Sequence, residues 1–193
     1  YLKVQRLMSY LLFPMGVGLY VYSDLVTKIL LGSQWSEASN IIGIWAITSA
    51  FTIVLGQLCG EVYRSKGLPK LSVIAQLMHL VVLIPAIFIA SKYGFWTLVY
   101  IRSFIRFQYV LVHFFVMKKY MGFPIFETIK NVSPAFISSI VMGSFALFLK
   151  QYSSSIIWSF ISIFICIIVY FSVLILFPNT RKELRTTLSS IIS

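Results

Sequence analysis

The sequence predicts an all-α fold, a polytopic transmembrane helical bundle of about six spans. The chain of 193 residues is 59% hydrophobic, only 11% of its residues are charged, and its mean hydropathy is +0.92. Soluble domains carry about 25% charged residues, so a water-soluble monomer of this composition would lack polar surface. The apolar runs are long and continuous, whereas strands of a membrane β-barrel alternate apolar and polar residues. Two cysteines are too few for a disulfide framework, and hydrophobicity this high excludes intrinsic disorder.

Six apolar runs are long enough to cross a bilayer, whose hydrocarbon core of about 30 Å needs about 20 helical residues. The predicted spans lie near residues 7–22, 38–59, 71–91, 95–117, 132–149 and 156–177. The chain therefore divides into a transmembrane helical region, residues 1–178, and a basic cytoplasmic tail, residues 179–193.

Individual residues give several of these spans their expected shape. In the first span Pro14 is expected to kink the helix. The span either stops at Asp24 or is extended by residues 25–31 as an amphipathic end that Gly32 would terminate. Pro85 is expected to kink the third span in the same way. The third and sixth spans are the most apolar and contain no ionisable residue except His79.

The basic residues outside the spans predict the orientation of the bundle. Eleven of them lie on the side that holds both termini, and three lie on the other side. By the positive-inside rule the first side is cytoplasmic, so both termini of this multi-pass segment are expected there. The net charge of +11 is thereby assigned to topology and to anionic headgroups. Nucleic-acid binding, which needs a contiguous basic patch on a soluble surface, is not expected. The eleven are Lys3, Arg6, Arg64, Lys66, Lys70, Lys118, Lys119, Lys130, Arg181, Lys182 and Arg185, and the three are Lys28, Lys92 and Lys150.

The fourth span carries the main candidate site. Arg102 and Arg106 are four residues apart and share a helix face, which Tyr109 and His113 continue. Counting about 1.5 Å per residue from Phe95 places Arg106 near mid-membrane, where a charge costs roughly 3 kcal/mol on insertion scales. We interpret the face as the cationic lining of a cavity for a negatively charged substrate, since guanidinium binds phosphate bidentately. The structural alternative is that the arginines cap carbonyl groups or snorkel to the interface.

Other polar residues are secondary candidates or packing residues. Gln76 and His79 share a face of the third span and are the secondary candidates for the cavity. Cys59 and Cys166 lie in different spans without the spacing of a metal or redox motif, so they are expected to pack. The chain has no Walker loop, GxSxG or HExxH motif, and we therefore expect no enzymatic activity, no cofactor and no metal site.

Three motifs occur in a characteristic order along the chain. Phe13–Pro14 precede the turn LLGSQWSEA at residues 30–38, RSKGLPK follows at residues 64–70, and KYGFW follows at residues 92–96. In this order the motifs resemble those of polysaccharide and O-antigen flippases, the polysaccharide transporter family of the multidrug/oligosaccharidyl-lipid/polysaccharide exporter superfamily. The resemblance covers about residues 1–125.

This resemblance implies two helical lobes around a cavity that opens alternately to each membrane face. The chain begins with Tyr1 and shows no signal-peptide pattern. We therefore expect it to be the C-terminal half of a two-lobe transporter of twelve to fourteen spans, with its N-terminal lobe missing. The implied function is to flip a lipid-linked oligosaccharide, the repeat unit of a polysaccharide, across the bacterial inner membrane.

The expected partners are the lipid-linked anionic oligosaccharide, the lipid bilayer and the missing lobe. Two alternatives stay open: an integral-membrane enzyme that acts on lipid-linked sugars, and a non-catalytic membrane subunit of a polysaccharide-assembly complex.

Overall fold

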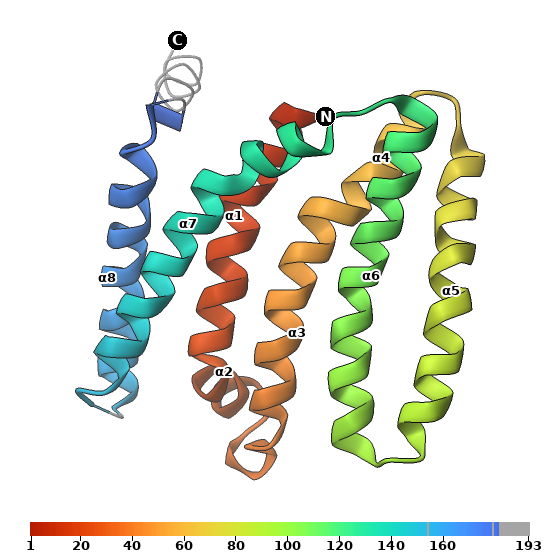
Figure 1. Ribbon diagram of the computed structural model, residues 1–193. Helices are drawn as coiled ribbons and strands as arrows, with labels where there is room; N and C mark the ends of the chain where they lie inside the picture. Colours follow the sequence, from red (N-terminus) through yellow and green to blue (C-terminus); the bar gives the residue numbers. More distant parts are fainter. Residues whose placement is uncertain (154, 179, 182–193) are drawn as a thin grey trace.

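The computed structural model describes residues 1–153, 155–178 and 180–181, and in that part of the chain every regular element is a helix (Figure 1). The predicted all-α polytopic bundle is confirmed. The elements are α1 (Leu2–Val21), α2 (Ser23–Leu30), the 3₁₀-helix η1 (Ser33–Trp35), α3 (Ala38–Thr52), the π-helix η2 (Ile53–Gln57), α4 (Leu58–Ser65), α5 (Pro69–Ser91), α6 (Phe95–Met121), α7 (Ile125–Lys150) and α8 (Ile156–Ile175).

The long helices stand side by side in one row (Figure 1). Their spatial order is α8, α7, α1, α3, α6 and α5, and each neighbouring pair packs together. The spatial order differs from the chain order because α7 returns to pack against α1. The helices α3, η2 and α4 follow one another without a break, and α4 packs against both α5 and α6.

Within the described residues, five helical segments are long and apolar enough to cross a membrane, and they correspond to the second to sixth predicted spans. The first predicted span, residues 7–22, corresponds to α1, which has 20 residues but is not one of the five. Its first two turns carry the polar residues Lys3, Gln5 and Arg6. The five segments are residues 38–65, 69–91, 95–121, 125–150 and 156–175.

Local signals explain where the helices end. A break at Tyr22 makes the predicted amphipathic extension a separate helix, α2, which finishes before Gly32. α6 continues past the predicted end to Gly122, whose left-handed conformation (φ 61°) terminates it. α7 begins seven residues before the predicted span. The prediction started late because Glu127 and Lys130 in the first turns of the helix interrupt the apolar run. Of the predicted tail, residues 179–193, only 180 and 181 are described.

Two glycines bring α1 close to its neighbours. A Cβ added at Gly16 would lie 2.8 Å from the Cβ of Ala50 on α3. A Cβ added at Gly143 of α7 would lie 2.5 Å from Cγ1 of Val17. Small residues allow such close helix approach in membrane proteins. α1 is thus packed tightly between α3 and α7, and this fixes the position of α3, which forms one wall of the site described below.

The basic residues gather at one end of the bundle. The start of α1 with Lys3, the turn between α4 and α5 with Lys66, and the end of α6 with Lys119 lie at the same end (Figure 1). Lys28 on α2 and Lys92 after α5 lie at the opposite end. The bundle therefore has the two-sided charge distribution on which the predicted orientation depends.

Candidate functional site

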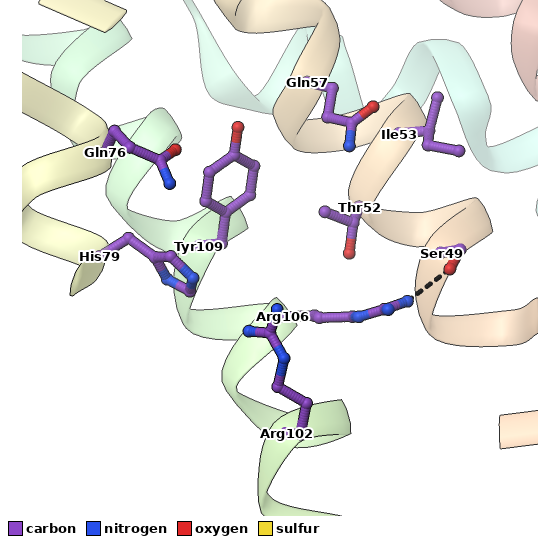
Figure 2. A pocket seen from close by; sticks show the side chains of 9 residues that line it. All are labelled: Ser49, Thr52, Ile53, Gln57, Gln76, His79, Arg102, Arg106 and Tyr109. Carbon is purple, nitrogen blue, oxygen red and sulfur yellow. Dashed lines mark hydrogen bonds between the residues drawn. The ribbon is translucent and has the colours of Figure 1, made fainter. Parts of the chain in front are cut away.

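A polar cavity of about 300 Å³ lies between α3, η2, α5 and α6 (Figure 2). It brings Gln76 and His79 of the third predicted span together with Arg102, Arg106 and Tyr109 of the fourth. Five of the six sequence-predicted site residues therefore meet in one place. The lining contains no acidic residue, and it comprises Ser49, Thr52, Ile53, Gln57, Gln76, His79, Arg102, Arg106 and Tyr109.

The π-helix η2 shapes one side of this cavity. Its carbonyl groups need partners outside the regular helical pattern, and the Gln5 side chain of α1 donates a hydrogen bond to the carbonyl of Val54 at 3.2 Å. Gly56 gives room for the ring of Tyr109, because a Cβ added there would lie 2.9 Å from two of its ring carbons. The wide turn thereby seats Tyr109 against η2, and Gln57 at the end of η2 lines the cavity.

Arg106 connects α6 to α3. Its Nη1 donates to the carbonyl of Trp45 and to Oγ1 of Thr48, both at 3.3 Å, and to Oγ of Ser49. Its guanidinium carbon lies 5.5 Å from the centre of the Trp45 ring, within cation–π range. These acceptors are all neutral, so they hold the guanidinium in place and leave its positive charge uncompensated. Arg106 therefore also does what the structural alternative predicts, because it donates to one backbone carbonyl, that of Trp45.

Arg102 lies one helical turn from Arg106 and differs from it. Figure 2 shows both arginine side chains at the cavity between α3, η2, α5 and α6. Arg102 is partly buried. Among the described residues no hydrogen bond or ion pair holds Arg102. Two positive charges one turn apart repel each other, and a partly buried charge without a partner is costly. An anion between them would relieve both costs, and each guanidinium has unused N–H donors for it.

His79 and Gln76 supply the opposite wall of the cavity from α5. His79 is 6% exposed, and its Nδ1 lies 2.7 Å from Oε1 of Gln108. Since an amide oxygen only accepts, Nδ1 donates this bond, and Nε2 remains for a ligand. The His79 ring also meets the Tyr109 ring edge to face at 5.1 Å between centroids. Gln76 also lines the cavity and is exposed. Helix α5 thus places two neutral polar side chains opposite the arginines of α6.

His113, the sixth predicted site residue, does not line the cavity. It is 1% exposed, and its ring lies parallel to the Tyr63 ring of α4 at 5.7 Å between centroids. The Tyr63 hydroxyl donates to the backbone carbonyl of His113 at 3.1 Å. His113 also contacts Tyr109 from behind, with ring centroids 4.4 Å apart. It shares the predicted helix face, but α4 covers this part of the face, so His113 supports Tyr109 and makes no contact with the cavity.

Sequence reasoning did not single out Ser49 and Thr52, the hydroxyl groups that α3 adds to the cavity. The available signal was the spacing of Thr48, Ser49 and Thr52, three hydroxyl residues within about one turn of an otherwise apolar span. Within the described residues no cluster of histidine, cysteine and carboxylate side chains is arranged to hold a metal ion.

Comparison with known proteins finds a family that matches the start of the chain. Residues 1–40 match a protein family described as polysaccharide biosynthesis protein. No curated protein matches the chain, and no solved structure matches it. Together with the five membrane-length helices, the family match supports a membrane protein of polysaccharide biosynthesis.

The matched segment covers α1, α2, η1 and the first residues of α3. It contains Phe13–Pro14 and the LLGSQWSEA turn at residues 30–38, the first part of the resemblance found in the sequence. The cavity residues, which run from Ser49 to Tyr109, lie beyond it. The role of the cavity therefore has to be argued from its own geometry.

Proposed function

We propose that this chain is part of a transporter that moves a lipid-linked, negatively charged oligosaccharide, the repeat unit of a polysaccharide, across the bacterial inner membrane. In this proposal the cavity between α3, η2, α5 and α6 binds the phosphate-bearing part of the substrate. The match to polysaccharide biosynthesis proteins supports the substrate class, and the membrane-length helices support the location.

The observation that carries the proposal is that Arg102 has a positive charge without a partner among the described residues. It lines a polar cavity without acidic residues. Arg106 presents a second positive charge in a fixed position, because α3 holds its Nη1. A phosphate accepts two parallel hydrogen bonds from a guanidinium, so a diphosphate suits two guanidinium groups one turn apart. Gln57, Gln76 and the free nitrogen of His79 add neutral groups of the kind that bind sugar hydroxyls.

The test is a flipping assay with the full-length protein in vesicles and a fluorescent lipid-linked oligosaccharide. Arg102→Gln should lower the rate of transfer by about tenfold or more, because a hydrogen bond to a charged group contributes roughly 1.5–3 kcal/mol. Arg64→Gln is the matched control, since Arg64 is exposed at the end of α4 and pairs with Glu61 at 3.0 Å.

Three results would contradict the proposal. An Arg102→Gln protein that transfers substrate at the wild-type rate would show that the cavity does not bind the charge. Conversion of the substrate to a new covalent product would indicate an enzyme. A well-folded full-length protein that moves no lipid-linked substrate would indicate a non-catalytic subunit.

A further inference from the structure

The helices α1 and α8 leave an apolar groove between them on the far side of the bundle from the arginine cavity. Both helices pack against α7, and the groove has a volume of about 400 Å³. Leu11 and Met15 of α1 lie along one rim, and Ile167 and Phe171 of α8 lie along the other. Each pair is spaced by four residues, and all four side chains are about half exposed. With α1 and α8 as the first and sixth predicted spans, the groove would open toward the hydrocarbon of the bilayer.

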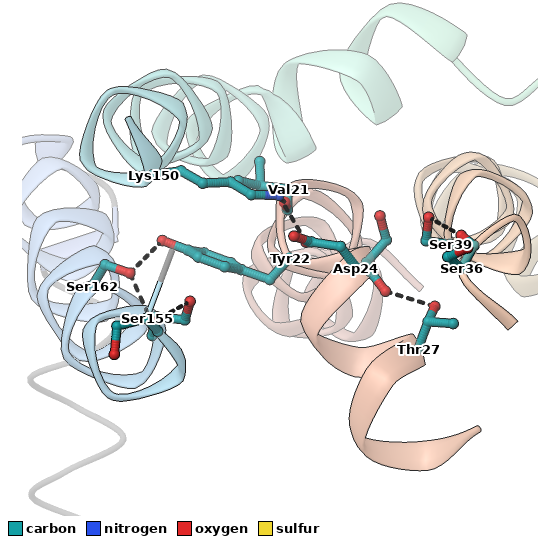
Figure 3. Close-up of polar contacts among 11 residues, drawn as sticks. Val21, Tyr22, Asp24, Thr27, Ser36, Ser39, Lys150, Ser155 and Ser162 are labelled. Carbon is teal, nitrogen blue, oxygen red and sulfur yellow. Dashed lines mark hydrogen bonds and ion pairs between the residues drawn. The ribbon is translucent and has the colours of Figure 1, made fainter. Parts of the chain in front are cut away.

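Three tyrosines, Tyr10, Tyr22 and Tyr170, line the groove, and their hydroxyl groups are hydrogen-bonded within the protein. The Tyr22 hydroxyl donates to Oγ of Ser162 at 2.8 Å (Figure 3). The Tyr170 hydroxyl donates to the backbone carbonyl of Tyr10 at 2.9 Å. The second bond joins α8 to α1, and the first joins α8 to the break between α1 and α2. The walls consequently offer apolar contacts, which suit an aliphatic chain better than water.

The length of the groove matches one leaflet of a bilayer. From Tyr10 to Tyr22 it follows twelve residue steps along α1 and the break after it, which is about 18 Å at 1.5 Å per residue. The hydrocarbon core is about 30 Å thick, so one leaflet contributes about 15 Å. A single acyl chain of one leaflet therefore fits along the groove.

A polar pocket of about 310 Å³ lies next to the groove at the α2 end. Leu25 lines the pocket and its neighbour Val26 lines the groove. On α8, Ser159 lines the pocket and Ile163, one turn further, lines the groove. Helix α8 contributes to both spaces, and α2 borders both through Leu25 and Val26. The polar pocket and the apolar groove thus lie next to each other and could hold the two ends of one amphipathic molecule.

The charges of the pocket leave one positive group without a partner. Asp24 accepts a hydrogen bond from Nζ of Lys150 at 2.7 Å, and this Nζ also donates to the carbonyl of Val21 at 2.8 Å (Figure 3). Lys28 lines the same pocket, is exposed, and has no hydrogen-bond or ion-pair partner among the described residues. With Asp24 neutralised, the pocket carries a net charge of one positive unit, which a single phosphodiester balances.

The remaining pocket wall is rich in hydroxyl groups, contributed by Ser33, Ser36, Ser39 and Ser159. The hydroxyls of Ser39 and Ser159 donate to backbone carbonyls and can accept from a ligand. Those of Ser33 and Ser36 can both donate and accept. Such a wall suits a polyol headgroup. An ethanolamine headgroup would instead add a second positive charge beside Lys28.

From the groove, the pocket and their charge, we propose that this site binds one molecule of an anionic glycerophospholipid, phosphatidylglycerol. One of its two acyl chains lies between α1 and α8, its phosphate meets Lys28, and its glycerol headgroup meets the serine hydroxyls. The site is separate from the arginine cavity and does not depend on the transport proposed above.

The test is native mass spectrometry of the full-length protein, released from detergent and titrated with phosphatidylglycerol or phosphatidylethanolamine. Lys28→Gln should weaken phosphatidylglycerol binding by about fivefold, the effect of one basic side chain near an anionic headgroup. Gly18→Leu should abolish binding, because Gly18 lines the groove and an added Cβ meets no atom within 4 Å. The added side chain therefore starts in the open space of the groove.

Two matched controls accompany these variants. Lys92→Gln removes a lysine from the same end of the bundle, and Val81→Phe adds bulk to a residue of α5 that is 73% exposed. Both should bind phosphatidylglycerol as the wild type does. If Gly18→Leu lowers the unfolding temperature, Ile167→Trp at the rim replaces it as the groove-filling variant.

The proposal is overturned if groove filling leaves phosphatidylglycerol binding unchanged, or if Lys28→Gln has no more effect than Lys92→Gln. Equal affinity for phosphatidylethanolamine and phosphatidylglycerol would also overturn it, because the charge balance at Lys28 predicts a preference.

Discussion

Removal of either arginine from α6 should separate the structural contribution of Arg106 from the charge contribution of Arg102. Arg106 donates to three acceptors on α3, whereas no described residue bonds to Arg102. Hydrogen bonds between membrane helices contribute about 0.6 kcal/mol each on average, so Arg106→Ala should lower the free energy of unfolding by about 2 kcal/mol. Arg102→Ala breaks no hydrogen bond and removes a partly buried charge without a partner among the described residues, so it should not lower the free energy of unfolding.

Thermal unfolding of the full-length protein in detergent, followed by tryptophan fluorescence, measures this difference. On the scale of soluble domains of similar size, 2 kcal/mol corresponds to a Tm lower by roughly 4–8 °C. Arg102→Ala should not lower the Tm. Transport should fall in both variants, because both remove a positive charge from the cavity.

Arg106→Lys and Arg106→Gln are the informative companions. Lysine keeps the charge without the planar fork and should restore transport in part. Glutamine still donates to a carbonyl or a hydroxyl and should restore stability more than transport. Equal destabilisation by Arg102→Ala and Arg106→Ala would refute the distinction between them. A stable and fully active Arg106→Gln protein would show that the charge of Arg106 is not needed.

Three further predictions concern packing, orientation and the extent of the chain. Gly143→Val should lower the unfolding temperature by several degrees, because its Cβ would lie 2.5 Å from Val17; an unchanged temperature would show that α1 and α7 approach less closely. Single cysteines in a cysteine-free background should react with an impermeant thiol reagent in intact cells at Ser36 but not at Lys119, and the reverse pattern would invert the proposed orientation. Residues 1–193 produced alone should insert into membranes without flipping substrate, since their cavity is walled by α3, η2, α5 and α6 only; transport by this monomeric chain would contradict the proposed two-lobe arrangement.

The helical spans could be predicted from the sequence because hydropathy and helix length depend on consecutive residues. The prediction shortened α7 at its start, where Glu127 and Lys130 interrupt the apolar run, although these residues continue the helix. Polar residues of a terminal turn can remain helical in the headgroup region, and a search for apolar runs does not register them.

The candidate site was predictable within each helix and not between helices. Helical spacing placed Arg102, Arg106 and Tyr109 on one face, and the structure puts all three on the cavity. The same spacing included His113, because it contains no information about α4, which covers that turn. Ser49 was missed for the same reason, since only the packing of α3 against α6 brings it to Arg106.

The π-helix η2 has a consequence for how the length of this segment can vary. A π turn holds about one residue more than the α turn that it replaces. Deletion of one residue between Ile53 and Gln57 would therefore let α3 continue into α4 as a regular helix. The contacts of Tyr63 further along α4 would be kept, while the seat of Tyr109 at Gly56 would be lost. The loss of a single codon at this position would therefore reshape the cavity wall without rearranging the bundle.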